Sequence, residues 1–215
     1  MDRQRALLGS SIGFFVLFAI ATFAAGTPPK PNDSGEKIVA WVTEHQTALR
    51  WSEWCVMIAG ILFIVYALLM REILGGLAGN AFLVGVAGTG ILTTTVGWIT
   101  LGLARRPGSV DPATARTLYD VASYWGPMLI TFTVLTLGAL AYAGLKGGQL
   151  PRWVGLLAAV TLIEQLVESV TIFGSRGFIA PGGAMNSMLG AGLSLITWLV
   201  AGIVASRHKS QGSTA

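Results

Sequence analysis

Residues 152–173 read RWVGLLAAVTLIEQLVESVTIF, an apolar run long enough to cross a lipid bilayer that nevertheless contains Glu164 and Glu168. A carboxylate near the bilayer centre costs about 2.5 to 3.5 kcal/mol on insertion scales, so two of them in one span require surroundings other than lipid. The polar residues of this run recur at helical spacings and form one stripe on a helix: Thr161, Glu164, Gln165, Glu168 and Thr171. We expect the stripe to face protein or water.

The rest of the chain has the same apolar character. It has 215 residues, of which 53% are hydrophobic and 11% are charged, whereas soluble domains carry about 25% charged residues. Six apolar runs predict six transmembrane helices, near residues 6–26, 52–70, 80–103, 117–143, 152–173 and 184–205. We therefore expect an all-α fold, an integral membrane bundle of six transmembrane helices in a single domain.

An extra helix is predicted between the first two spans. Three prolines within residues 27–32 stop any helix, and Asp33 followed by Glu36 has the spacing of a capping box. The pattern of residues 38–48, which include Trp41, then predicts an amphipathic helix at the membrane interface.

The fourth span also has clear local signals. Asp111 followed by Pro112 predicts a helix start, with an N-cap and a proline in the first turn. Pro127 should kink this helix, because proline has no backbone N–H to continue the hydrogen-bond ladder.

The positions of the basic residues bear on orientation. With the amino terminus inside, the 14 Lys and Arg residues divide equally between the two sides, but the inside segments are shorter and so have the higher density of positive charge. We expect both termini to be cytoplasmic in a multi-pass protein of the cell membrane. Residues 6–26 are expected to be a retained anchor rather than a cleaved signal peptide, because five more spans follow.

Several classes of function are disfavoured. The net charge is +4, yet the basic residues lie at the ends of apolar runs, so no nucleic-acid partner is expected. Cys55 is the only cysteine, which excludes a cluster of thiolate ligands. His45 and His208 lie outside the apolar runs, so we expect neither haem nor a metal centre in the membrane, and no other cofactor.

Three segments carry a resemblance to a known family. They are PPKPNDSGEKIVAWVTEH (28–45), DPATARTLYD (111–120) and LPRWVG (150–155). In these segments and their order the chain resembles a family of uncharacterised bacterial polytopic membrane proteins with a domain of unknown function. The resemblance implies a six-helix architecture and carries no activity over to this chain.

Acidic and aromatic residues gather in the outer half of the predicted bundle. Glu168 and Glu164 are the candidate catalytic or proton-coupling groups, because intramembrane carboxylates usually mark functional sites. The candidate ligand-binding residues are acids, aromatics and one amide of the same region: Glu53, Asp120, Trp54, Trp98, Trp125, Tyr124 and Gln165. Three plainer interpretations stay open, and in the first a protonated Glu164 or Glu168 has only a structural role, bonded to a threonine or a backbone carbonyl of another span. The aromatic residues would suit a membrane interface, and Glu53 and Asp120 could pair with Arg50 or Arg116.

We expect the lipid bilayer to be one partner of the protein. Three hypotheses for its function follow. The first is binding or transport of a small lipophilic or cationic molecule, with tryptophan rings contributing cation–π contacts. The second is an intramembrane enzyme that uses Glu168 as a general acid on a terpenoid-like or lipid-like substrate. The third is an accessory subunit of a membrane complex, whose polar stripe would contact a membrane-protein partner. The sequence leaves open whether the protein is an enzyme.

Overall fold

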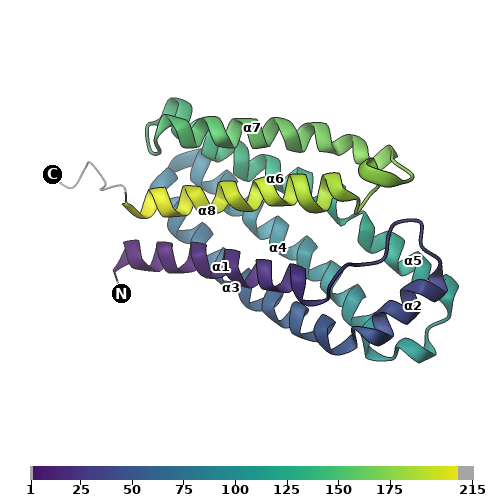
Figure 1. Ribbon diagram of the computed structural model, residues 1–215. Helices are drawn as coiled ribbons and strands as arrows, with labels where there is room; N and C mark the ends of the chain where they lie inside the picture. Colours follow the sequence, from purple (N-terminus) through teal and green to yellow (C-terminus); the bar gives the residue numbers. More distant parts are fainter. Residues whose placement is uncertain (1, 208–215) are drawn as a thin grey trace.

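The computed structural model describes residues 2–207, and the tail that holds His208 lies outside them. Within this range the chain is helical without strands, and six helical segments are long and apolar enough to cross a membrane (Figure 1). The helices are α1 (Arg3–Ala24), α2 (Gly35–Glu44), α3 (Gln46–Leu74), α4 (Gly76–Arg105), α5 (Pro112–Ser123), α6 (Trp125–Tyr142), α7 (Arg152–Glu168) and α8 (Ala191–Arg207). The predicted all-α bundle of six spans is confirmed, and these spans identify a multi-pass membrane protein.

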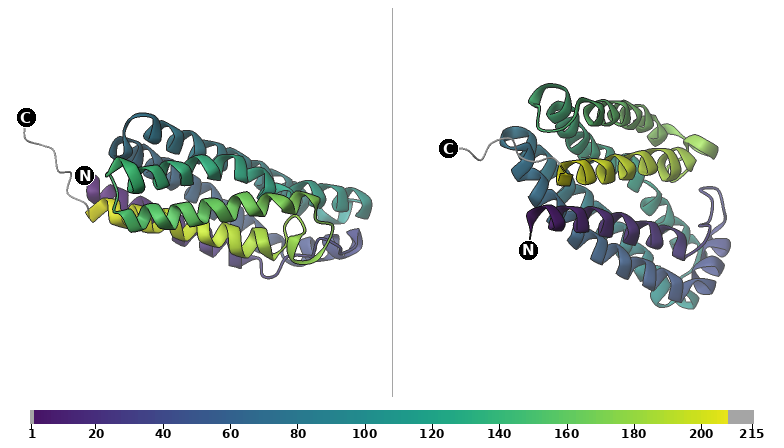
Figure 2. Two further views of the ribbon diagram at one scale, coloured as in Figure 1. Left: turned by 90° about the horizontal axis from the view of Figure 1, so that it is seen from above. Right: turned by 60° about the vertical axis from the view of Figure 1, so that its left-hand side comes forward.

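The spans pack as a ring in chain order. α1 packs against α3, α3 against α4, α4 against α6, and α6 against α7, while α8 contacts both α7 and α1 and so closes the ring. The start of α1 and the end of α8 lie at one end of the bundle, which we call the terminal end. α2 and α5 lie at the opposite end, which we call the cap end (Figure 1 and Figure 2).

Small residues allow neighbouring spans to approach closely. On α4, a Cβ atom at Gly85 would lie 2.6 Å from the side chain of Thr136 on α6. Near the turn that joins α6 to α7, a Cβ at Gly144 would lie 2.5 Å from the backbone nitrogen of Gly155. Such contacts hold helices together in a bilayer, where apolar side chains gain little by leaving lipid.

The predicted amphipathic helix is present as α2, but its apolar face packs against protein. Ile38 and Val42 are buried in a cluster with residues of α5 and with the adjoining ends of α3 and α4. The loop before α2 is also tied to α5, because Tyr119 Oη donates to the carbonyl of Pro29 at 2.6 Å and Arg116 Nη1 donates to that of Asp33 at 2.8 Å. Together α2, α5 and this loop cover the cap end.

The start of α2 differs from the predicted capping box by one residue. Ser34, rather than Asp33, is the N-cap, and its side chain accepts from the N–H of Lys37. Asp33 instead accepts from Lys37 Nζ at 2.8 Å and from the N–H of Lys30 at 2.7 Å. These hydrogen bonds lower the pKa of Asp33, with that from Lys37 having the largest effect. Serine suits the cap because its short side chain reaches the first turn of the helix.

The two signals in the fourth span are confirmed. Asp111 is the N-cap of α5 and accepts from the N–H of Thr114 at 3.0 Å. The helix is interrupted at Tyr124, which separates α5 from α6, and Pro127 lies in the first turn after the interruption. The last two spans are irregular at their cap ends as well, because α7 ends in a 3₁₀ turn (Ser169–Phe173) and a π-helical turn (Met185–Gly190) precedes α8.

The terminal half of the bundle is filled by packed side chains. The rings of Phe14 and Phe63 stack with centroids 4.1 Å apart. Tyr66 Oη donates to the carbonyl of Trp198 at 2.9 Å, and Trp198 Nε1 donates to Thr136 Oγ1 at 3.1 Å. We call Phe14, Phe63, Tyr66 and Trp198 the aromatic plug. Large apolar side chains such as Ile61 and Val84 are exposed on the outer faces of the spans, as contact with lipid requires.

Candidate functional site

A cluster of polar side chains lies inside the bundle around Glu168, whose side chain is 2% exposed. Asn186 Nδ2 donates to one carboxylate oxygen of Glu168, and Gln165 Nε2 donates to the other at 2.6 Å. Gln165 Oε1 in turn accepts from Thr133 Oγ1 on α6 at 2.8 Å. Asn186 Oδ1 accepts from the N–H of Gly182 at 3.2 Å, which fixes which end of the amide faces Glu168. The cluster therefore joins α6, α7 and the start of the last span.

The polar stripe predicted on the fifth span faces protein, as expected. Thr161, Gln165, Glu168 and Thr171 are all buried, and Thr161 Oγ1 is 2.9 Å from Thr197 Oγ1 on α8. Glu164 is half-buried beside the cluster. Its Oε2 accepts from Gln165 at 3.0 Å, while its Oε1 is buried without a hydrogen-bond partner among the described residues.

Two carboxylates lie against glycines of neighbouring helices. A Cβ atom at Gly190 would overlap Glu168 Oε2, and one at Gly97 on α4 would overlap Glu53 Oε2. Only glycine leaves room for these carboxylates at the helix surface. The positions of both acids therefore depend on a residue in another span.

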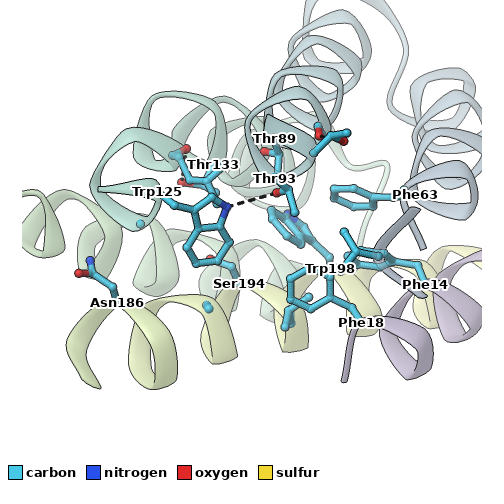
Figure 3. A pocket seen from close by; sticks show the side chains of 18 of the residues that line it. Phe14, Phe18, Phe63, Thr89, Thr93, Trp125, Thr133, Asn186, Ser194 and Trp198 are labelled. Carbon is cyan, nitrogen blue, oxygen red and sulfur yellow. Dashed lines mark hydrogen bonds between the residues drawn. The ribbon is translucent and has the colours of Figure 1, made fainter. Parts of the chain in front are cut away.

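An inner cavity of about 70 Å³ adjoins Glu168, and all six spans contribute to its wall. Its principal lining residues are five aromatic rings, five hydroxyls and the polar cluster: Phe14, Phe18, Phe63, Trp125, Trp198, Thr89, Thr93, Thr94, Thr133, Ser194, Gln165, Glu168 and Asn186. Figure 3 shows aromatic side chains grouped around this space. It is smaller than an apolar cavity of about 150 Å³ that holds benzene in another protein, so it suits a group of a few non-hydrogen atoms.

A larger outer cavity of about 350 Å³ lies toward the cap end. Glu53 is among its lining residues, together with parts of α2, α4, α5 and the proline-rich loop. The two cavities meet at four shared residues: Phe18, Val56, Thr93 and Trp125. At this boundary Trp125 Nε1 donates to Thr93 Oγ1 at 3.4 Å, the dashed line in Figure 3.

Charge inside the bundle is one-sided. Neither cavity is lined by a lysine, arginine or histidine among residues 2–207. Over the same range, ion pairs join Arg3 to Glu72, Lys37 to Asp33 and Arg116 to Asp120, and none involves a carboxylate of the cavities. No three His, Cys, Asp or Glu side chains of this range come together as a metal site. The cavities therefore present carboxylates without a positive partner from the described chain.

The structure brings together only some of the predicted site residues. Glu168, Gln165 and Trp125 line the inner cavity and Glu53 the outer one, while Glu164 lies beside the polar cluster. The other aromatic candidates are exposed and line neither cavity: Trp54 at 51%, Trp98 at 68% and Tyr124 at 41%. Asp120 pairs with Arg116 away from the cavities, which matches the plainer interpretation of this acid. We leave these four residues out of the proposed site.

Several site residues were not singled out by sequence reasoning. Asn186 had a usable signal, because it is an amide near the start of an apolar span. Ser194, Trp198 and Phe63 had none, because small and aromatic residues are ordinary in membrane helices and their shared cavity appears only after the helices pack.

No protein-family model matches the chain, and neither a curated protein nor a solved structure matches it significantly. The resemblance carried by the three segments stays a prediction.

Proposed function

We propose that this protein binds a small organic cation in its inner cavity, with Glu168 as the counter-charge. The observation that carries the proposal is the setting of Glu168. Both of its carboxylate oxygens accept hydrogen bonds from neutral amides, and the described cavity lining holds no basic side chain. A buried carboxylate is costly without a positive partner. A cation supplied by the ligand would offset that cost.

The rest of the cavity wall supports a cation with an apolar body. Indole and phenyl faces attract positive charge, most strongly where water is excluded, and Trp125, Trp198 and Phe14 line the cavity. The volume of about 70 Å³ favours a short primary ammonium over a bulky one. Such a group can also donate to the carboxylate of Glu168, which is an acceptor-only partner.

The outer cavity supports a route to this site from the cap end. Glu53 provides a second carboxylate on the way, and no lysine, arginine or histidine among residues 2–207 lines this cavity. Negative charge that lines a cleft raises the local concentration of cations and speeds their association.

Transport is a second candidate, favoured by one specific observation. The two joined cavities run from the cap end toward the middle of the bundle, while the aromatic plug fills the terminal half. This is the shape expected of a carrier that is open to one side of the membrane. Uptake of a labelled ammonium ion into liposomes that contain the protein, absent from protein-free liposomes, would distinguish a carrier from a binding protein.

The other two hypotheses have less support from the geometry. A general acid must hold a proton, but both oxygens of Glu168 already face amide N–H donors. The polar stripe, which motivated an accessory role, contacts Thr133 and Thr197 within the chain. Its burial is therefore explained without a partner protein.

The proposal is tested by titrating the purified protein with n-propylammonium in a calorimeter. We expect saturable binding that Glu168→Gln weakens at least about 30-fold, since removing one partner of a buried charge pair costs roughly 2 kcal/mol or more. Glu44→Gln, which alters an exposed acid at the same end, should bind as the parent does.

A second arm uses a neutral ligand, so that the conclusion does not depend on one variant. 1-Propanol has the same number of non-hydrogen atoms as n-propylammonium without the charge, and it should not bind the parent protein detectably. Thermal unfolding should show that Glu168→Gln is folded. Equal binding of the two ligands, or unchanged affinity in folded Glu168→Gln, would contradict the proposal.

A further inference from the structure

Ser194 stands apart from the other hydroxyl groups of the spans. It lies on α8, its side chain is 3% exposed, and it lines the inner cavity. Its Oγ is buried and has no hydrogen-bond partner among the residues that the structure describes. Figure 3 shows it among the side chains that line the cavity.

Most other hydroxyls of the spans donate to a backbone carbonyl of the preceding helical turn, and Ser194 does not. Ser10 donates to the carbonyl three residues earlier at 3.1 Å, and Thr89 donates to the carbonyl four residues earlier at 2.9 Å. Serine and threonine in helices use these backbone acceptors by default, especially in a bilayer. A buried hydroxyl that makes no such bond lowers the stability of the ligand-free protein.

Among the described residues that line the inner cavity, only Ser194 has a polar atom that is buried without any hydrogen-bond partner. Thr89 and Thr133 already donate to a carbonyl or an amide oxygen, and Glu168 is an acceptor. Ser194 therefore offers an O–H to an oxygen of a ligand. It lies four residues beyond Gly190, the residue against Glu168 Oε2, so the two polar positions are roughly 6 Å apart along the last span.

We propose that Ser194 donates a hydrogen bond to the ligand, which is therefore a small ammonium ion with a hydroxyl or carbonyl oxygen about two carbons from its nitrogen. The inference rests on the proposed function, since it assumes that the ammonium group lies beside Glu168. The spacing suits a two-carbon link, which lets the nitrogen face the carboxylate while the oxygen faces Ser194. Ser194 would then determine specificity within the class of small cations.

The test compares two ligands that differ in one group. Ethanolammonium and n-propylammonium have the same charge and the same number of non-hydrogen atoms, with a hydroxyl in place of a methyl group. We expect the parent to bind ethanolammonium about 3- to 10-fold more tightly, the range of one net hydrogen bond. Ser194→Ala should abolish this difference, because neither ligand then has a hydroxyl partner at this position.

The outcomes separate the two proposals. Ser10→Ala removes a buried hydroxyl that lines neither cavity, so it should keep the preference for ethanolammonium. If both ligands bind the parent equally, or if Ser194→Ala weakens both by the same factor, the role of Ser194 is refuted while cation binding stands. If neither ligand binds the parent, the proposed function itself fails.

Discussion

Glycine determines where a carboxylate can lie inside this bundle. Gly190 and Gly97 each present bare backbone to an acid of another helix, Glu168 and Glu53 respectively. Larger residues at these positions would occupy the space of the carboxylate oxygens. The acids and their glycines therefore form two pairs, although they are far apart in the sequence.

Gly190→Ala tests the first of these pairs. The added Cβ overlaps Glu168 Oε2, so the carboxylate must turn away and lose its bonds from Gln165 and Asn186. We expect a loss of stability of about 1 to 3 kcal/mol, the usual cost of overpacking, and weaker binding of n-propylammonium. Thermal unfolding in detergent and calorimetry measure the two effects.

Gly192→Ala is the matched control in the same span. A Cβ at Gly192 meets no atom within 4 Å, and alanine is the better helix former, so stability should stay the same or rise slightly. If Gly190→Ala behaved like Gly192→Ala, the close contact with Glu168 would be disproved.

At this scale the sequence predicted part of the site. Helical spacing placed Gln165 and Glu168 on one buried face, because neighbours within a helix follow from 3.6 residues per turn. It did not predict that Asn186 contacts Glu168, since this contact depends on how the last span packs against α7. Contacts between helices have no comparable periodic signal.

The interruption between α5 and α6 lies next to the boundary between the two cavities. Trp125 is the first residue after the break at Tyr124, and its indole donates to Thr93 at the boundary between the cavities. Pro127 made this break predictable, whereas its relation to the cavities followed only from the packing of α4 against α6. The indole is thus positioned to slow passage from the outer cavity to the inner one.

Thr93→Val tests this role. Valine keeps the shape of threonine and removes the oxygen that accepts from Trp125. We expect n-propylammonium to bind faster, with an affinity within about threefold of the parent, because the change affects the barrier and not Glu168. Stopped-flow tryptophan fluorescence measures the association rate. Thr95→Val, at an exposed site on α4, should keep the parental rate, and an unchanged rate in Thr93→Val would argue against a barrier.

The cap of α5 gives a prediction about pH. Hydrogen bonds from the side chain and N–H of Thr114 hold the pKa of Asp111 below its ordinary value. A depressed pKa in the folded state stabilises the fold above the unfolded pKa, near 4, and this contribution is lost as pH falls through the folded value. Asp111→Asn keeps a good N-cap without the titration. Thermal unfolding between pH 7 and 3 should therefore show a smaller acid-induced loss in Asp111→Asn than in the parent; parallel curves would contradict this.

At the scale of the whole molecule, the number and order of spans could be predicted because hydropathy is a local property. The closure of the ring by α8 against α1, and the cavities inside it, could not, because both depend on which faces of different helices meet. The cap over the outer cavity was missed for the same reason. α2 has the pattern of an interfacial helix, and nothing within α2 indicates that its apolar face packs against α5.

Orientation gives a prediction for the whole molecule. The density of basic residues leads us to expect the cap end outside the cell and the terminal end in the cytoplasm. In a Cys55→Ala background, a cysteine that replaces exposed Asp120 at the cap end should react with a membrane-impermeant maleimide in intact cells. One that replaces exposed Glu72 near the terminal end should react only after lysis. The reverse pattern would invert the proposed orientation.

The bonds that join the proline-rich loop to α5 have a mechanical consequence. Tyr119 and Arg116 hold the carbonyls of Pro29 and Asp33, so this loop and α5 form one body on the cap side of the break at Tyr124. If α5 rotates about that break, the loop before α2 must move with it. These two walls of the outer cavity then move as one rigid unit. In that case a single rotation would set the width of the mouth, and a wider rotation would admit a larger ligand.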